Sequence, residues 1–147
     1  MAISEPDRLY IRRKDRETYE IILGSDSPLR GQDAKVAFLM AMLTGYDEGK
    51  ELDLASSKDG YFRSEYLTDF EKTVVKAIAV QKKGGLAVLL DMKEVYAIAE
   101  RYAAGGLESL KGHLLSGEHG SYEKRLELLL REKATRLVSP PLRADAP

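Results

Sequence analysis

A cluster of basic residues lies near the start of the chain. Residues 8–16 hold five basic side chains against one acid, a net charge of +4: Arg8, Arg12, Arg13, Lys14 and Arg16, with Asp15. Guanidinium and ammonium groups bind phosphates, and arginine also pairs with guanine, so the cluster suits a polyanion such as DNA. A solvated basic face that binds nothing is the alternative. Residues 45–71 hold eight acids and three bases, net −5, so the near-neutral total hides a basic end and an acidic middle.

The spacing of these residues predicts how they would act. Residues 8–13 alternate in polarity, with Leu9 and Ile11 on one side and Arg8, Tyr10 and Arg12 on the other, which predicts a short strand. If DNA is bound, we expect the second set to act together on one face and to contact bases. Arg13 and Lys14, off that face or beyond the strand, would then contact phosphates.

The other motifs in the sequence lack residues that a catalytic site or a metal site requires. The chain has no cysteine, and His113 and His119 are its two histidines, whereas zinc sites use three or four ligands. A calcium loop centred on Gly60 would need oxygen ligands at the positions of Ala55 and Tyr66. We therefore expect no catalytic residue, no cofactor and no metal, in a protein that is not an enzyme.

Length and composition indicate one ordinary globular domain. The chain has 147 residues, of which 44% are hydrophobic and 32% charged, so it can bury a core of its own. No secretory signal is evident at the start, and the apolar run over residues 36–43 is far shorter than a bilayer span. We expect a cytoplasmic protein without a membrane segment, with a helical domain over residues 1–138 and a disordered tail over residues 139–147.

The first half of the chain must supply the elements that position the basic cluster. The pattern predicts a helix over 15–23 and a second helix over 32–44, ended by Gly45. The second helix is apolar nearly all round, which is typical of a helix surrounded by other helices or by a second chain. Residues 45–63 are expected to form a long acidic connection, and Thr68 opens the next helix with a capping box.

The second half is expected to be helical as well. Residues 86–90 form a short apolar run that fits either a strand or a helical turn. A helix starting at Asp91 is expected to stop at Gly105–Gly106, followed by a short helix over 107–114 and a last helix over 121–137. The fold class predicted is mainly α, with about six helices and a short N-terminal strand.

The order of elements over residues 7–45 resembles the ribbon-helix-helix fold of small prokaryotic DNA-binding dimers. The likeness consists of a short basic strand, a helix, a turn with Pro28 and a strongly apolar helix. The resemblance implies that two chains pair their strands into a ribbon in the major groove, with Arg8, Tyr10 and Arg12 facing bases. It also implies that Arg30, near the start of the second helix, lies close to phosphate.

A second resemblance covers residues 8–115. It rests on the segments RLYI, SPL, DAKVAFLMAMLTGY and AERYAAGGLESL, which are similar to small prokaryotic proteins found with DNA phosphorothioation (Dnd) systems. This resemblance implies a role in DNA modification and defence.

Two functions compete on these observations. The first is a non-enzymatic, DNA-associated accessory or regulatory protein of such a system, acting as a homodimer. The alternative is an adaptor that joins protein partners of the same system without touching DNA, through the apolar helix and the last leucine-rich helix. Salt discriminates between them, because DNA binding weakens steeply as salt rises whereas a leucine interface is nearly indifferent.

Overall fold

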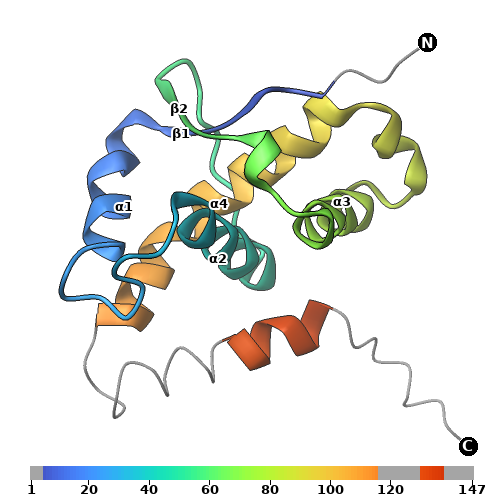
Figure 1. Ribbon diagram of the computed structural model, residues 1–147. Coiled ribbons are helices and arrows are strands. Elements are labelled where there is room, and N and C mark those ends of the chain that lie inside the picture. Colours follow the sequence, from blue (N-terminus) through green and yellow to red (C-terminus); the bar gives the residue numbers. More distant parts are fainter. Residues whose placement is uncertain (1–4, 116–129, 138–147) are drawn as a thin grey trace, which may run out of the picture.

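The structure of the chain is a computed structural model that describes residues 5–115 and 130–137. Figure 1 shows α2 and α4 against each other in the middle of the molecule, with α1 on one side and α3 on the other. The fold is mainly α, as predicted. The principal elements are β1 (Arg8–Arg12), α1 (Arg16–Ile22), α2 (Ala34–Glu48), β2 (Lys58–Arg63), α3 (Asp69–Lys83) and α4 (Met92–Leu115). Short 3₁₀ helices (η1–η3) occupy Arg13–Asp15, Ser64–Tyr66 and Leu86–Leu90.

The apolar helix α2 packs inside its own chain. Phe38 and Met42 are fully buried, and the helix is in contact with α4, α1 and β2. The expectation of a central helix is therefore confirmed, and within the described residues its surroundings come from the same chain. Self-association is not needed to bury α2.

Two of the glycines that were expected to end helices, Gly45 and Gly106, instead let two helices touch. A Cβ atom on Gly106 would lie 2.2 Å from the carbonyl oxygen of Ala41, and one on Gly45 would lie 2.0 Å from that of Tyr102. No side chain fits at either distance, so α2 and α4 cross with their backbones in contact. The predicted stops at Gly45 and at Gly105–Gly106 are wrong: both glycine sites lie inside continuous helices.

The true helix ends follow ordinary capping rules. Gly49 ends α2 and Gly84 ends α3, each with a positive φ, at 68° and 77°, that favours glycine. Thr68 and Glu71 form the predicted capping box, with N–H···O distances of 3.1 and 2.8 Å. The run over residues 86–90, which fits either a strand or a helical turn by its sequence, is a 3₁₀ helix, η3.

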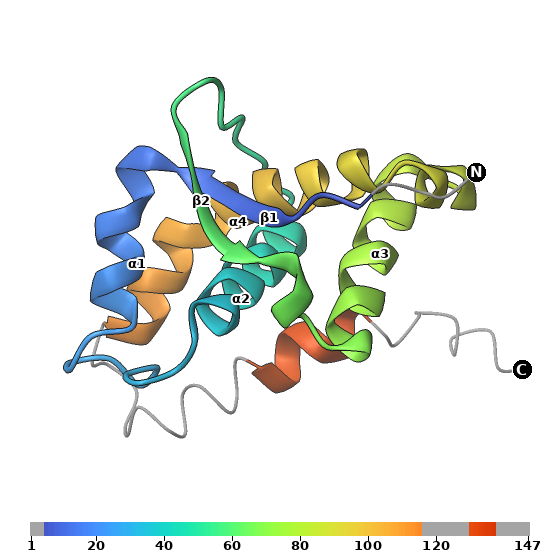
Figure 2. The ribbon, with the colours of Figure 1, turned by 45° about the horizontal axis from the view of Figure 1, so that its top comes forward.

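A two-stranded antiparallel sheet lies across α4. Leu9 and Ile11 of β1 are buried as predicted, and Phe62 of β2 joins them in the core. Figure 2 shows the two strands crossing the face of the molecule above α2 and α4. The expectation of a long acidic connection over 45–63 is wrong in its second part, because Lys58–Arg63 forms β2. Tyr61 and Phe62 pack on aromatic residues of the helices, and this packing holds the strand in place.

The ribbon-helix-helix expectation for residues 7–45 is not confirmed. A ribbon of that family pairs the strands of two chains, whereas β1 pairs with β2 of its own chain. On the other edge of β1, the backbone N–H of Tyr10 donates to Glu100 of α4 at 3.0 Å. Both edges of β1 are therefore engaged within one chain.

Residues 130–137 form a helical segment, in keeping with the last predicted helix. Lys133 and Arg136 donate to Asp47 of α2, with N···O distances of 2.6 to 2.7 Å. Burial of Asp47 opposes ionisation, but these hydrogen bonds outweigh it and hold the pKa of the carboxyl below its ordinary value. The rest of the predicted last helix and the predicted tail over 139–147 lie outside the described residues. Among the described helices, none has the length and apolar character that crossing a bilayer requires.

Candidate nucleic-acid interface

The sheet brings basic residues from distant parts of the sequence onto one face. In the antiparallel ladder Arg8 lies opposite Arg63, and Arg12 lies opposite Lys58. Directly opposed residues share a face of the sheet, so Arg8, Tyr10, Lys58 and Arg63 project together; we call these four residues the basic sheet face. Arg8, Lys58 and Arg63 are exposed, and Tyr10 is half-buried.

A glycine makes room for this arrangement. Gly60 lies opposite Tyr10, and a Cβ atom there would lie 3.0 Å from Cδ of Arg8 and 3.8 Å from the Tyr10 ring. The side chains of β1 therefore lean across the strand where β2 has no side chain. Lys58 in turn places its ammonium 4.8 Å from the centre of the Tyr10 ring, a cation–π contact.

The opposed cations weaken the sheet. Like charges directly across an antiparallel pair are destabilising by a fraction of a kcal/mol up to about 1 kcal/mol. Arg63 has an acidic neighbour, Glu65, at 3.2 Å, but both side chains are more than half exposed, so this ion pair contributes little. Arg8 is exposed and forms no ion pair within the described part of the chain. Such a set of cations suits an anionic ligand that would relieve the repulsion.

Arg12 does not belong to the free surface that the alternation predicted. Its guanidinium donates two hydrogen bonds to Asp15, at 2.8 and 2.9 Å, and its side chain is 17% exposed. Asp15 is itself buried. The expectation that Arg12 contacts bases is therefore unsupported, because the side chain serves to neutralise a buried carboxylate.

The remaining predicted contacts are scattered. Arg13 and Arg16 both donate to Asp59, at 3.0 and 3.3 Å. The hydrogen bond from Arg13, with the one from Arg16, holds the pKa of Asp59 below its ordinary value. Lys14 is exposed beside Arg13. Arg30 is exposed in the connection between α1 and α2, which Figures 1 and 2 show starting at the end of α1 away from the sheet, and it lines neither of the two hollows beside Arg8.

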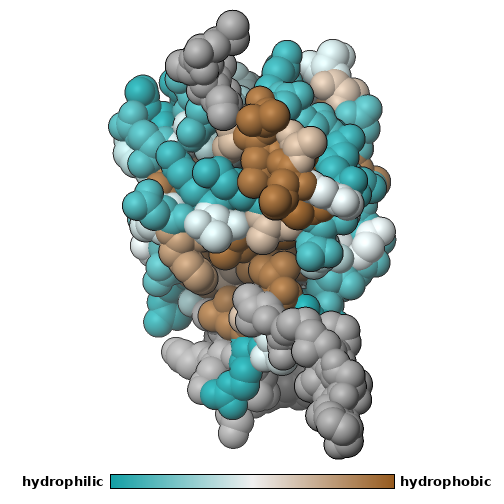
Figure 3. Space-filling view, turned by 90° about the vertical axis from the view of Figure 1, so that its right-hand side faces the viewer, coloured by the Kyte–Doolittle hydropathy of each residue, from teal (hydrophilic) through white to brown (hydrophobic). Residues whose placement is uncertain are grey.

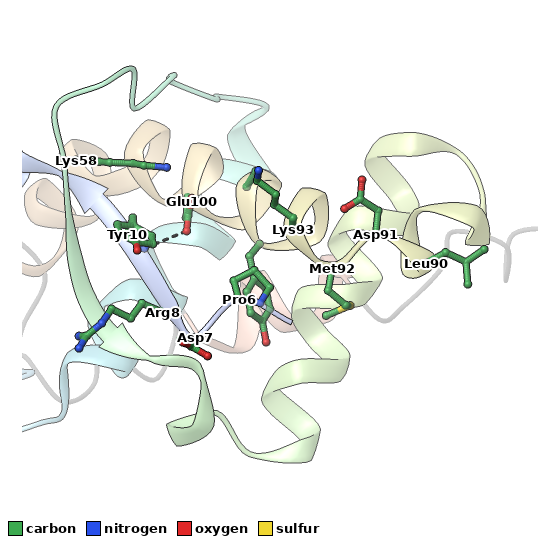
Figure 4. Close-up of a pocket in the computed structure, with 12 residues that line it drawn as sticks. Pro6, Asp7, Arg8, Tyr10, Lys58, Leu90, Asp91, Met92, Lys93 and Glu100 are labelled. Atoms are coloured by element: carbon green, nitrogen blue, oxygen red, sulfur yellow. Dashed lines mark hydrogen bonds between the residues drawn. The ribbon is translucent and has the colours of Figure 1, made fainter. Parts of the chain in front are cut away.

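Two hollows flank Arg8. One has a volume of about 660 Å³ and lies between β1 and the first half of α4 (Figure 4). The other, of about 550 Å³, is lined by Arg8, Lys35 and Arg63. Lys35 is bound there to Glu71 at 2.8 Å. The basic sheet face therefore continues on both sides into concave surface.

The larger hollow contains a buried carboxyl group. Glu100 of α4 is 9% exposed and accepts the hydrogen bond from the Tyr10 amide. Burial raises the pKa of Glu100 to about 7, although the Tyr10 amide and the charges of Lys58 and Arg101 act in the opposite direction. Figure 4 shows Glu100 reaching from α4 toward β1, with Lys58 and Arg8 on the strand side. A carboxyl with a raised pKa in a hollow is a frequent mark of a functional site.

Sequence reasoning missed half of this surface. Lys58 and Arg63 fell in the presumed acidic connection, and Glu100 was one acid among 24. Gly60, between two polar residues and Tyr61, gives the segment the composition of a turn. Only the pairing of β2 with β1 brings Lys58 and Arg63 to this surface, and the two strands are about fifty residues apart in the sequence.

An apolar surface lies elsewhere on the molecule. Leu86 and Leu90 of η3 are 71% and 73% exposed, and Phe70 at the start of α3 is 74% exposed. Figure 3 shows hydrophobic side chains gathered on the side of the molecule where α3 and η3 lie. Isolated exposed leucines are common, but a group of them favours contact with another protein.

Comparison with known proteins gives the family. The chain matches the family of DNA sulphur modification system-associated protein 4 over residues 31–141. No curated protein and no solved structure gives a significant match. The match includes β2 and α4, with Lys58, Arg63 and Glu100, and it begins after β1 and α1. It supports the resemblance to proteins of Dnd systems that the sequence suggested. Since the match covers most of its length, the chain belongs to the family of DNA sulphur modification system-associated protein 4.

Proposed function

We propose that this protein is a non-enzymatic accessory subunit of a DNA sulphur modification system and that it contacts duplex DNA through the basic sheet face. The observation that carries the proposal is the cross-strand register, which sets Arg8 opposite Arg63 and places Lys58 beside Tyr10. Association with a DNA-modifying system makes DNA the nearest polyanion.

The shape of the surface supports the proposal. The major groove of DNA is wide enough for a two-stranded antiparallel ribbon. Here the ribbon is formed by β1 and β2 of one chain, so the proposed contact is complete without a second copy. The exposed cations would bind phosphates, and Arg8, in the middle of the surface between the two hollows, could also reach bases.

The test is DNA binding by charge-neutral variants, measured by fluorescence anisotropy with a labelled duplex. Arg8→Gln, Lys58→Gln and Arg63→Gln should each weaken binding, and a phosphate contact should be lost about equally on unrelated sequences. Lys111→Gln, a basic residue in the last part of α4, is the matched control and should bind as the unchanged protein does. Equal affinity in all four variants, with folding intact by circular dichroism, would refute the proposal.

A second function is favoured by the exposed leucines of η3. An adaptor would dock a protein of the same system on Leu86 and Leu90. Leu86→Ser with Leu90→Ser should then abolish co-purification with co-expressed subunits of the system, whereas Ile21→Ser on α1, 42% exposed, should not. Binding that persists unchanged in high salt would identify this apolar contact and separate it from DNA binding.

A further inference from the structure

The hollow between β1 and α4 has the dimensions of a small-molecule site. Its volume of about 660 Å³ is within the usual range for ligand pockets. Arg8, Tyr10 and Lys58 line it as well as forming the basic sheet face. Any ligand of the hollow would therefore lie beside DNA bound to that face. A role for the hollow in DNA binding thus rests on the proposed function.

Glu100 gives the hollow a buried acceptor with capacity to spare. Its Oε2 atom accepts the Tyr10 amide at 3.0 Å. Within residues 5–115 and 130–137, no side chain donates a hydrogen bond to this carboxylate. An ionised carboxylate can accept about four hydrogen bonds, and the second oxygen of Glu100 is open to solvent. A ligand that carries N–H groups can therefore reach an acceptor that the described side chains leave available.

The hollow is lined by one buried acid and by exposed charges of both signs. Glu100 is buried, whereas the cations Arg8, Lys58 and Lys93 are exposed, and so is the acid Asp7. Asp91 also lies at the edge, but its carboxylate caps α4 by accepting the Glu94 amide at 3.2 Å. This arrangement fits a dipolar ligand, with hydrogen-bond donors at one end and an anionic group at the other.

The side chains around Glu100 suit a flat ligand. Tyr10 contributes an aromatic ring, and Met92 and Ala97 contribute apolar atoms from α4. Aromatic side chains bind unpaired bases by stacking, which is worth about 1–3 kcal/mol per base. A nucleotide combines a flat base that carries N–H groups with a phosphate, so it fits the Glu100 acceptor, the Tyr10 ring and the exposed cations of this hollow.

We propose that the hollow receives the base of an unpaired guanine nucleotide in the bound DNA. Guanine presents two adjacent donors, N1–H and the 2-amino group, on its Watson–Crick edge, and these match the two oxygens of one carboxylate. Glu100 accepts from that edge, the Tyr10 ring packs on the base, and Lys58 and Lys93 bind the flanking phosphates. Enzymes and readers that bind extruded bases use the same combination of edge contacts and stacking.

The test uses short single-stranded oligothymidines that carry one central guanine, hypoxanthine or thymine. Anisotropy is measured at about pH 8, where a carboxyl with a pKa of about 7 is mostly ionised. We expect the guanine oligonucleotide to bind about tenfold more tightly than the thymine one. Hypoxanthine keeps N1–H but lacks the 2-amino group, so its affinity should fall between them.

Three variants locate the effect. Glu100→Gln keeps an acceptor for the Tyr10 amide but loses the charge, and it should abolish the guanine preference. Tyr10→Leu should weaken binding of every oligonucleotide through lost stacking. Glu108→Gln, an exposed acid on the same helix, is the matched control and should keep the preference.

The outcomes separate the hollow from the duplex contact. Equal affinities for the three oligonucleotides, with duplex binding intact, would overturn the inference and leave the proposed function standing. A guanine preference that depends on Glu100 in a protein that binds no duplex would support the hollow and refute the ribbon contact. Deoxyguanosine monophosphate serves as a competitor: if it binds as tightly as the oligonucleotide, the ligand is a free nucleotide and not DNA.

Discussion

Arg8 of β1 lies directly opposite Arg63 of β2, and both side chains are exposed. Opposed like charges work against the pairing that positions them. The sheet is held instead by its other face, where Leu9, Ile11 and Phe62 are buried. The repulsion between these cations destabilises the free protein, and a bound anion would relieve it. This relief is the physical basis of the proposed DNA contact.

Replacing one of the opposed arginines by an acid should therefore stabilise the protein and impair binding. Arg8→Glu would place a carboxylate across from Arg63 and should raise the free energy of unfolding by about 0.2–1 kcal/mol. The same variant should lose affinity for duplex DNA. Urea denaturation and anisotropy measure the two effects. Arg30→Glu, away from the sheet, should change stability by less than about 0.5 kcal/mol; equal stability of both variants would argue against cross-strand repulsion.

Arg12 should matter for folding more than for DNA. Arg12→Ala leaves the buried carboxylate of Asp15 without its two hydrogen bonds and should cost about 1–3 kcal/mol. Lys14→Ala, two residues further on and exposed, should be nearly neutral in the same denaturation experiment. A stable Arg12→Ala protein with strongly reduced DNA affinity would restore Arg12 to the binding surface.

Glu100 should make stability depend on pH. Its pKa rises from the ordinary 4.5 to about 7 on folding, so its contribution to stability is complete below about pH 4.5 and is lost as the pH rises through 7. Glu100→Gln does not titrate and should be more stable than the unchanged protein above pH 7, by about 3 kcal/mol at most. The difference should vanish near pH 4.5. Thermal denaturation across this range checks the prediction, and a constant difference would contradict it.

The crossing of α2 and α4 should not tolerate a single added methyl group. Gly106→Ala would bring Cβ to 2.2 Å from the carbonyl oxygen of Ala41. We expect the free energy of unfolding to fall by about 3 kcal/mol, the upper end of the usual cost of overpacking. Gly112→Ala, in the same helix, meets no atom within 4 Å and should stabilise by about 0.5–1 kcal/mol. Calorimetry should give transition temperatures that move in opposite directions.

Local signals in the sequence predicted local structure well. The alternation around Leu9 placed β1, and the pairing of Thr68 with Glu71 placed the start of α3. Glycine misled the prediction at Gly45 and Gly106, because a glycine that ends a helix and one that admits a neighbouring backbone look alike without the neighbour. The difference is a tertiary contact, which the residues around the glycine do not encode.

The candidate site was half predictable for the same reason. The alternation along the first strand predicted that Arg8 and Tyr10 lie on the same outward face. Lys58 and Arg63 join them only through the ladder, and Glu100 joins through a hydrogen bond to the opposite edge of β1. The local pattern could not show that the Arg12 side chain binds Asp15. The same residues in the same order are compatible with an exposed arginine and with one that is paired to a buried carboxylate.

The salt dependence of duplex binding distinguishes DNA contact through the basic sheet face from an apolar contact. The logarithm of the association constant is measured against the logarithm of salt concentration, between about 50 and 200 mM. We predict a steep negative slope for the unchanged protein, made shallower by about 1 for each of Arg8→Gln, Lys58→Gln and Arg63→Gln. A slope near zero, or one that the three substitutions leave unchanged, would contradict DNA contact through the basic sheet face.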